Sequence, residues 1–340
     1  MGEWPAGAYP MSQDNAEMLR WLLSSGAVAE TAIDELLLIA VHRNATACAR
    51  LLLEAGADWR YENFRKFCSA DVVVDLEIAR MLVDYGADPA RLNSYALKLY
   101  IGLGFTRTVD LTWQECLDGY YRRFGITNPE RIKIPFWDVM VLTSSHPLEV
   151  ESWFRHTPGR CEGSLPWCYC RDGMSFTVLP DGRFIQIGGS LRNSSKPVDH
   201  WVYNDAILHD GKGGFEILGY PEEVFPPTDF HTATLAGEWI YLIGNLGYPN
   251  ARGPETPVYR LHVESLMIEK IQSTGESPGW IHEHKAALEN GRIRISGGKR
   301  PVDDPKSSSS TEDLSDSYWF DPASGIWEKE RSGTIADELG

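Results

Sequence analysis

The chain has 340 residues, a length that fits two or three domains, and 43% of them are hydrophobic while 24% are charged. These proportions are typical of folded globular proteins and exclude disorder over most of the length. With 32 Lys and Arg against 48 Asp and Glu the net charge is −16, which argues against nucleic-acid binding because an acidic surface repels phosphate groups. The longest apolar run, residues 36–41, is too short to cross a membrane, and residues 1–6 match neither a secretory signal nor a myristoylation site. We therefore expect a cytoplasmic protein without a membrane partner.

Three similar segments follow one another at a spacing of 30 residues, each centred on a glycine: Gly26, Gly56 and Gly86. Apolar residues precede each glycine at helical spacing, and glycine readily adopts the left-handed conformation that ends a helix. The sequences ARLLLEAGAD (residues 49–58) and ARMLVDYGAD (residues 79–88) resemble the second helix of ankyrin repeats. The period is shorter than the usual 33 residues, and the Thr-Pro-Leu-His opening of the first helix is missing. The resemblance covers about residues 12–100 and implies an ankyrin-like helical solenoid over residues 1–100.

Residues 101–165 show no repeat. Residues 111–124, 138–142 and 148–154 have helical patterns, and prolines interrupt them. We expect this part to be a helical connector that caps the open end of the solenoid.

From about residue 170 onward, short alternating apolar segments are separated by Asp-Gly, Asn-Gly and Gly-Gly pairs, which is typical of β-hairpins. Three blocks align on glycines 188, 244 and 297, which are 56 and 53 residues apart, and the last block ends in Tyr318 and Trp327. Residues 170–330 thereby resemble kelch repeats, whose period is about 50 residues. The resemblance implies three antiparallel, four-stranded, propeller-type blades within residues 166–330, followed by a flexible tail over residues 331–340. Three blades leave open edges, so we expect them to be covered by the connector or by a homodimer.

The sequence thus predicts a multidomain chain, first α and then β, that resembles bacterial ankyrin-repeat proteins with a kelch-like tail. Both repeat families build surfaces that hold other proteins. The resemblance therefore implies a non-catalytic interaction protein, an adaptor or a partner-sequestering protein of the immunity type, that uses its ankyrin-like concave face and its kelch-like loops. The acidic composition suits a basic partner, and no cofactor is implied.

One loop stands out as a contact surface. Residues 247–255 contain Tyr248, Asn250 and Arg252, and an aromatic side chain on a loop has less structural purpose than one on a strand. We select these three residues as the candidate interaction site.

The alternative hypothesis is a small-molecule-binding or metal-dependent enzymatic propeller with a site between the blades. Asp229 and His231 would share one face of a strand and could form an acid–base pair, and His284 occupies the same repeat position as His231. A hydrogen-bonding role inside the blades explains both histidines more simply, so we assign no catalytic residue. Cys161, Cys168 and Cys170 lack the paired spacing of recognisable zinc sites, and whether they bind a metal is left open.

Overall fold

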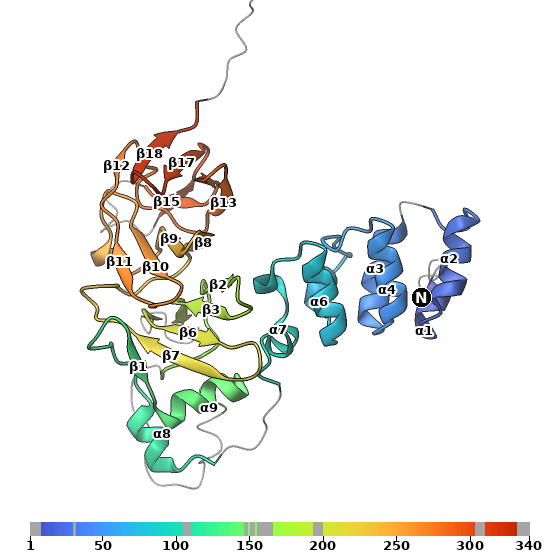
Figure 1. The fold of residues 1–340 in the computed structure, drawn as a ribbon, viewed down its shortest axis with the longest axis horizontal. Coiled ribbons are helices and arrows are strands. Elements are labelled where there is room, and N and C mark those ends of the chain that lie inside the picture. The colour runs from blue at the N-terminus through green and yellow to red at the C-terminus, as the bar shows by residue number, and fades with distance from the viewer. Residues whose placement is uncertain are drawn as a thin grey trace, which may run out of the picture. The chain divides into compact units, whose positions relative to one another are not determined.

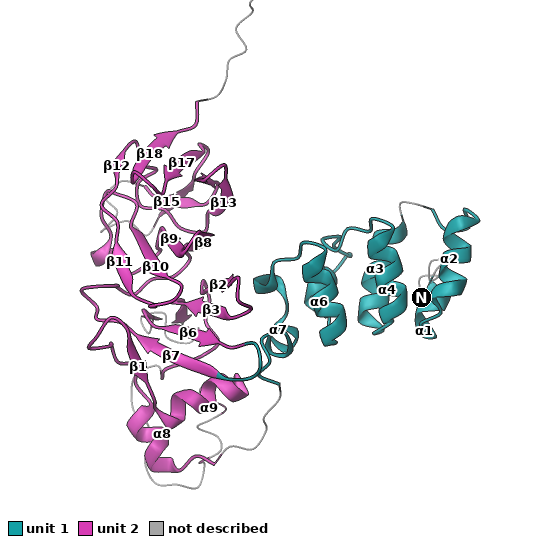
Figure 2. Cartoon of the chain, in the orientation of Figure 1, with its two compact units in different colours: residues 1–105, 211–214 teal, residues 106–210, 215–340 magenta. Residues whose placement is uncertain are grey.

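The computed structural model describes residues 8–29, 32–104, 110–145, 149, 154, 166–192, 200–302 and 310–331. Two compact units make up the chain (Figure 2). The first comprises residues 1–105 with residues 211–214, and the second comprises residues 106–210 with residues 215–340.

The first unit is helical. Its elements are α1 (Ala8–Ser12), α2 (Ala16–Ser24), α3 (Ile33–His42), α4 (Thr46–Glu54), α5 (Ser69–Val72), α6 (Leu76–Asp84), the 3-10 turn η2 (Pro89–Arg91) and α7 (Ser94–Tyr100). Helix α4 contacts α2, α3 and α6, and α6 in turn contacts α7 (Figure 1). Leucines and isoleucines that are fully buried form one continuous core along these helices: Leu19, Leu36, Leu37, Leu52, Ile78 and Leu82.

The glycines of the 30-residue repeat end α2, α4 and α6 as the sequence predicts, with φ angles of 71° at Gly26 and 89° at Gly56 and Gly86. The regular ankyrin-like solenoid is nevertheless wrong as a description of this unit. The helices are unequal, since α5 has four residues and α3 has ten. Residues 57–68, which a repeat would use for its hairpin and first helix, form an irregular loop instead.

The second unit contains three larger sheets, which we call the first, second and third sheet. The first has the strand order β1-β7-β6-β3-β2, the second β11-β10-β9-β8 and the third β12-β18-β17-β14-β13. In the first sheet the strands are β1 (Glu130–Ile132), β2 (Ser175–Val178), β3 (Phe184–Ile187), β6 (Ala206–His209) and β7 (Phe215–Gly219). In the second they are β8 (Thr232–Ala236), β9 (Trp239–Ile243), β10 (Val258–His262) and β11 (Ile268–Lys270).

In the third sheet they are β12 (Thr274–Gly275), β13 (Lys285–Glu289), β14 (Arg292–Ser296), β17 (Tyr318–Asp321) and β18 (Ile326–Lys329). Two short hairpins pair β4 (Ser190–Arg192) with β5 (His200–Val202), and β15 (Lys299–Pro301) with β16 (Thr311–Asp313). The short 3-10 turn η3 (Pro249–Ala251) follows the second strand of the second sheet.

The three sheets stack in order, because β8 contacts both β2 and β13. One apolar core fills the space between the first and second sheets, with Ile185, Leu218 and Ile240 among its buried residues. Another lies between the second and third sheets and includes Ile243 and Trp327. The sheets also approach closely at glycines. A Cβ atom on Gly188 would collide with the carbonyl oxygen of Thr228, in the segment before β8, and one on Gly244 with that of Ile281, in the segment before β13. A Cβ on Gly297 would meet nothing within 4 Å.

Residues 101–165 do not form the expected helical connector. They supply α8 (Trp113–Gly119) and α9 (Pro135–Thr143), but also β1, which pairs with β7 and so becomes the outer strand of the first sheet. Trp137 of α9 is fully buried and stacks on Trp167 with ring centroids 4.6 Å apart. The indole of Trp167 donates a hydrogen bond to Asp205, beside β6. This segment is therefore built into the sheet unit. The expected helix over residues 148–154 lies almost entirely outside the described residues, as does the tail beyond residue 331.

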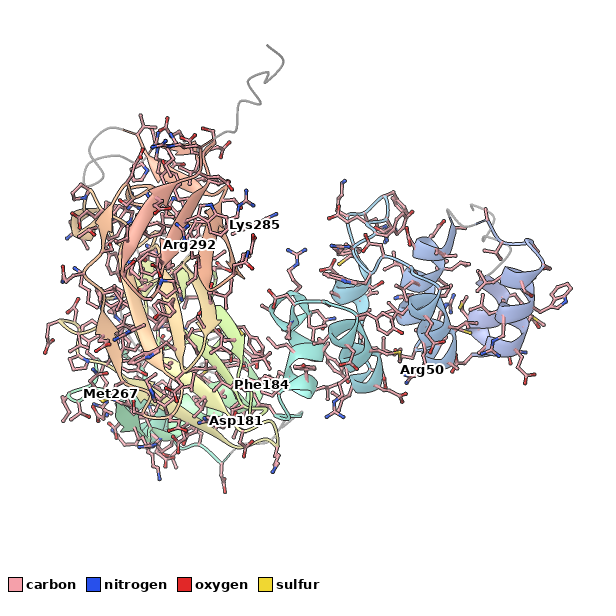
Figure 3. The ribbon with its side chains drawn as sticks, turned by 45° about the horizontal axis from the view of Figure 1, so that its top comes forward. Arg50, Asp181, Phe184, Met267, Lys285 and Arg292 are labelled. Carbon is pink, nitrogen blue, oxygen red and sulfur yellow. The ribbon has the colours of Figure 1, made fainter. Side chains whose placement is uncertain are left out.

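The three kelch-like, four-stranded, propeller-type blades are also wrong. Two of the sheets have five strands, and β12 runs parallel to β18. In the described part of the chain the three sheets do not close into a ring. The exposed face of the third sheet carries Arg292–Glu328 and Arg294–Glu330 ion pairs at 2.6 and 2.8 Å, with the ring of Trp319 beside both arginines. Figure 3 labels Arg292 on this sheet. A face of this composition suits water rather than another sheet.

Candidate functional site

Three turns with left-handed backbone conformations precede β2, β8 and β13, the strands at one edge of each of the three sheets. Phe230 and Glu283 have φ angles of 53° and 56°, and Gly173 has 63°. The amide of Phe230 donates to the carbonyl of Gly173 at 2.8 Å, and the amide of Glu283 donates to the carbonyl of Phe230 at 2.9 Å. The three turns therefore lie in a row. A bulky or charged side chain in the left-handed region is strained, and such strain gathers at functional sites.

His231 and His284, selected from the sequence, connect neighbouring sheets. Nε2 of His231 lies 2.9 Å from the hydroxyl of Ser175, and Nε2 of His284 lies 2.9 Å from the hydroxyl of Thr232. Burial lowers the pKa of His231 to about 4 and that of His284 to about 3, so both rings are neutral near pH 7. Their bonds join the start of β8 to β2 and the start of β13 to β8, which is a structural role.

Asp229 is fully buried and has other partners than His231. Its Oδ1 accepts a hydrogen bond from the amide of Gly247 at 2.7 Å, while Oδ2 lies 3.8 Å from Nε2 of His200. Burial alone would raise the pKa of this carboxyl group. The polar groups of His200, Gly247 and Ser190 outweigh it, and the pKa lies below its usual value. Asp229 is therefore an ionised carboxylate inside the protein.

Several polar atoms around Asp229 are buried without a hydrogen-bond partner among the described residues. They are Oδ2 of Asp229, Oγ of Ser190, Nε2 of His200 and both ring nitrogens of His282. Burial lowers the pKa of His282, while the charges of Glu283 and Asp229 act in the opposite direction. Unpaired polar atoms in a protein interior cost free energy, so a group of them is a candidate for a functional role.

The sequence did not reveal Ser190 and His200 as members of this group. They come from the hairpin β4–β5, far along the chain from Asp229, and neither belongs to a repeated position. We call Asp229, Ser190, His200 and His282 the Asp229 cluster.

The candidate interaction loop lies beside this cluster. The hydroxyl of Tyr248 accepts a hydrogen bond from the amide of Val202 at 2.9 Å, and its ring packs edge-on against His200. Arg252 is buried, with only 6% of its surface exposed, and its Nε donates to the carbonyl of Leu246. Asn250 alone of the three candidate residues is exposed. The loop therefore holds the β4–β5 hairpin as well as facing solvent.

Of the three cysteines left open as metal ligands, Cys161 lies outside the described residues. The thiol of Cys168 is buried and contacts the carbonyl of Cys170, whose own thiol is exposed and lies 3.4 Å from the carbonyl of Ser144. Over the described ranges, His, Cys, Asp and Glu side chains nowhere gather in a group of three that could hold a metal ion.

A second candidate surface lies in the helical unit and was missed from the sequence. Within the loop of residues 57–68, Phe64 is 89% exposed and Phe67 is 47% exposed. The side-chain oxygen of Asn63 accepts hydrogen bonds from the amides of Arg65 and Phe67 at 2.8 and 3.1 Å, and the amide of Asn63 donates to the carbonyl of Phe67 at 3.0 Å. These bonds fix the turn that presents both rings to solvent. The sequence signal that could have revealed this surface is a pair of phenylalanines that flank Arg65 and Lys66 and follow neither helical nor strand periodicity. We call residues 57–68 the aromatic loop.

No protein-family model matches the chain, and no curated protein is significantly similar to it in sequence. No helix in the described part of the chain is both long and apolar enough to cross a membrane.

Proposed function

We propose that this chain is a non-catalytic protein that binds another protein, and that the aromatic loop of the helical unit is its principal contact. The observation that carries the proposal is the exposure of Phe64 and Phe67 on a turn that hydrogen bonds hold in one conformation. Aromatic anchors supply much of the energy of protein interfaces, and a rigid loop loses little conformational entropy when it binds.

The charges in the loop and on the whole chain indicate separate roles for apolar contact and for electrostatic attraction in binding. The guanidinium group of Arg65 lies 5.4 Å from the ring centroid of Phe64, and Lys66 pairs with Glu62 at 3.5 Å. The loop itself thus supplies apolar contact. The net charge of −16 on the whole chain attracts a partner that is basic overall, which speeds association more than it tightens the complex.

The test is a pull-down of the tagged full chain from the cytosol of its host, with the captured protein then purified and its affinity measured by calorimetry. The loop variant is Phe64→Ser with Phe67→Ser. The matched control is Ile126→Ser, because Ile126 is 81% exposed but lies in the sheet unit. We expect the unchanged chain and the control to hold the partner equally well, and the loop variant to lose about tenfold or more in affinity.

Raising the salt concentration should weaken the association in all three chains, since attraction between exposed charges is screened. Equal affinity of the loop variant and the unchanged chain would refute the aromatic loop as the contact. A homodimer that dissociates in the loop variant, measured by sedimentation, would identify a second copy of the chain as the partner.

A further inference from the structure

Strand β13 is an edge strand of the third sheet and has more exposed side chains than any other edge strand of the three sheets. It pairs with β14 on one side, and no other strand in the described part of the chain pairs with its outer side. Four of its five residues have exposed side chains: Lys285, Ala287, Leu288 and Glu289. An edge strand of this kind offers unpaired backbone amide and carbonyl groups to another strand.

The outer face of β13 carries one charge of each sign. Side chains alternate along a strand, and the register places Ala287 opposite Arg294 and Glu289 opposite Arg292, on the charged face of the third sheet. Lys285 shares this face, and Figure 3 labels it as the first residue of the strand. Both arginines already form ion pairs with glutamates, and the charge of Glu289 also acts on Arg294. Lys285 and Glu289 themselves form no ion pair with the described residues.

The inner face of β13 is apolar. Ala286 packs against the core between the second and third sheets. Leu288 shares this face and lies opposite the buried Ile293 of β14, yet 43% of its surface is exposed. The apolar layer under the third sheet therefore extends to the edge of the sheet, where Leu288 is only partly covered.

These residues are complementary to themselves when two copies of β13 run antiparallel. A two-fold axis at Ala287, perpendicular to the sheet, places this residue opposite its own counterpart. Lys285 of each copy then lies opposite Glu289 of the other, so the pair of opposite charges occurs twice. On the inner face, Leu288 of each copy lies opposite Ala286 of the other. Opposite charges in directly opposed positions stabilise a pair of strands, and like charges destabilise it.

Neighbouring registers lack this complementarity. An axis at Ala286 would place Glu289 opposite Glu283, which has the same charge, and an axis at Leu288 would place Lys285 opposite a glycine. A lysine on an exposed edge usually opposes pairing with a second strand. In the register centred on Ala287, the glutamate opposite the lysine replaces that repulsion with attraction.

The other edges of the three sheets offer less to a second copy. Strands β2 and β8 carry no charged side chain, and β1 and β12 have only three and two residues. The outer side of β11 is occupied by Asn128, whose side chain forms two hydrogen bonds with the backbone of Ile268, at 2.7 and 2.9 Å. Strand β13 is therefore the edge best suited to a symmetric contact.

We propose that the chain forms a symmetric dimer in which the β13 strands of two copies pair antiparallel, centred on Ala287, and join the two third sheets into one. This surface is independent of the aromatic loop, which lies in the helical unit. The pairing satisfies the outer backbone groups of β13 and covers Leu288. Because a strand of five residues buries a small area, the dimer is weak and its amount depends on the concentration of the chain.

The test is the oligomeric state of the full-length chain, measured by sedimentation velocity over a series of chain concentrations at one ionic strength. The unchanged chain is compared with Lys285→Glu, with Glu289→Lys and with the double variant that carries both changes. Each single variant brings like charges together twice across the axis and should weaken dimerisation by about tenfold or more. The double variant restores two pairs of opposite charges and should dimerise like the unchanged chain.

This comparison separates the local pairs from the charge of the whole chain. The two single variants change the net charge in opposite directions, so a loss of dimer in both arises from the contact itself. Lys270→Glu, which changes an exposed lysine on β11 of the second sheet, is the matched control and should dimerise unchanged. Circular dichroism verifies that each variant is folded. An unchanged chain that stays monomeric at every concentration, single variants that dimerise normally, or a folded double variant that fails to dimerise would overturn the proposal.

A second measurement locates the contact. Amide hydrogen exchange over residues 285–289 should slow as the concentration of the unchanged chain rises, because pairing protects the outward-facing amides. The double variant Phe64→Ser with Phe67→Ser, which tests the aromatic loop, should dimerise like the unchanged chain. Loss of the dimer in that loop variant, or exchange at residues 285–289 that does not change in a chain that dimerises, would place the contact elsewhere and refute the pairing of β13.

Discussion

The guanidinium group of Arg171 pairs with the carboxylate of Asp205 at the start of the first sheet, where the two side chains are only 1% and 5% exposed. Nε1 of Trp167 donates to Oδ2 of Asp205 at 2.7 Å, and the ring centroid of Tyr203 lies 3.7 Å from the guanidinium carbon of Arg171. Arg171 also donates to the carbonyls of Cys168 and Gly188, at 2.6 and 3.0 Å. The pair thus joins the segment before β2 to the start of β6.

Replacement of Asp205 by alanine should lower the free energy of unfolding by about 3–5 kcal/mol, because it leaves the buried charge of Arg171 without an opposite charge. Denaturant unfolding followed by tryptophan fluorescence measures the change. Asp181→Ala, which breaks the exposed Arg183–Asp181 pair, should cost about 1 kcal/mol or less. Similar losses in the two variants would show that the buried pair contributes no more than a surface pair.

Acid should destabilise the sheet unit well before its carboxyl groups are protonated. Burial lowers the pKa of His209 and His231 to about 4 and that of His284 to about 3, while an unfolded histidine titrates near 6.5. The unfolded chain then binds more protons than the folded one, so stability is complete above about pH 6.5 and falls steadily toward about pH 4. Denaturant midpoints between about pH 7 and about pH 4 measure the effect.

A double variant, His231→Gln with His284→Gln, tests the source of this dependence. Glutamine retains a polar atom near the hydroxyls of Ser175 and Thr232 but does not titrate. We expect a shallower fall of stability with acid in the variant. An unchanged slope would assign the acid sensitivity to other groups.

The aligned glycines of the three sheets should respond differently to alanine. At Gly244 a Cβ atom would lie 2.6 Å from the carbonyl oxygen of Ile281, and the φ angle is 79°. At Gly297 the φ angle is 62°, but nothing lies within 4 Å. Gly297→Ala should therefore cost only the backbone strain, about 1 kcal/mol, and Gly244→Ala clearly more. Equal losses in thermal or denaturant unfolding would mean that contact between the sheets does not require glycine.

The aromatic loop should affect binding without affecting folding. Phe64→Ser removes an exposed side chain and should change the free energy of unfolding by no more than about 0.5 kcal/mol. Leu52→Ala, in the core of the same unit, should cost about 2–5 kcal/mol. Asn63→Ala releases the turn and should speed amide exchange at Arg65 and Phe67. A large loss of stability in Phe64→Ser would assign the ring a structural role.

Local features of this fold followed from the sequence, but the arrangement of the three sheets did not. The left-handed conformations at Gly26, Gly56 and Gly86 were predictable because glycine tolerates them best, and the turn at Asn290-Gly291 joins β13 to β14 as its residues indicate. Strand β1 was not predictable, since three residues are too few for a period of two to show. Whether the three sheets close into a ring depends on the outer faces of the first and third sheets. Alignment of the repeats gives no information about those faces.

Of the Asp229 cluster, only Asp229 was identified from the sequence, as one half of a hypothetical acid–base pair with His231. Asp229 and His231 precede β8, and His284 precedes β13. Alignment of the repeats assigned the two histidines to the same repeat position. Alignment of the repeats could not identify the residues that lie next to Asp229 in space. Ser190 and His200 reach it from a hairpin whose placement depends on the hydroxyl of Tyr248, a contact between distant segments.

The charged outer face of the third sheet means that this sheet has an apolar contact with the rest of the unit on one side only. That sheet is attached through one apolar layer, whereas the first sheet has β1 as a further strand and is tied through Trp167 and Trp137 to α9. Separation of the third sheet would expose the apolar face of the second sheet, with Ile243, to any chain nearby.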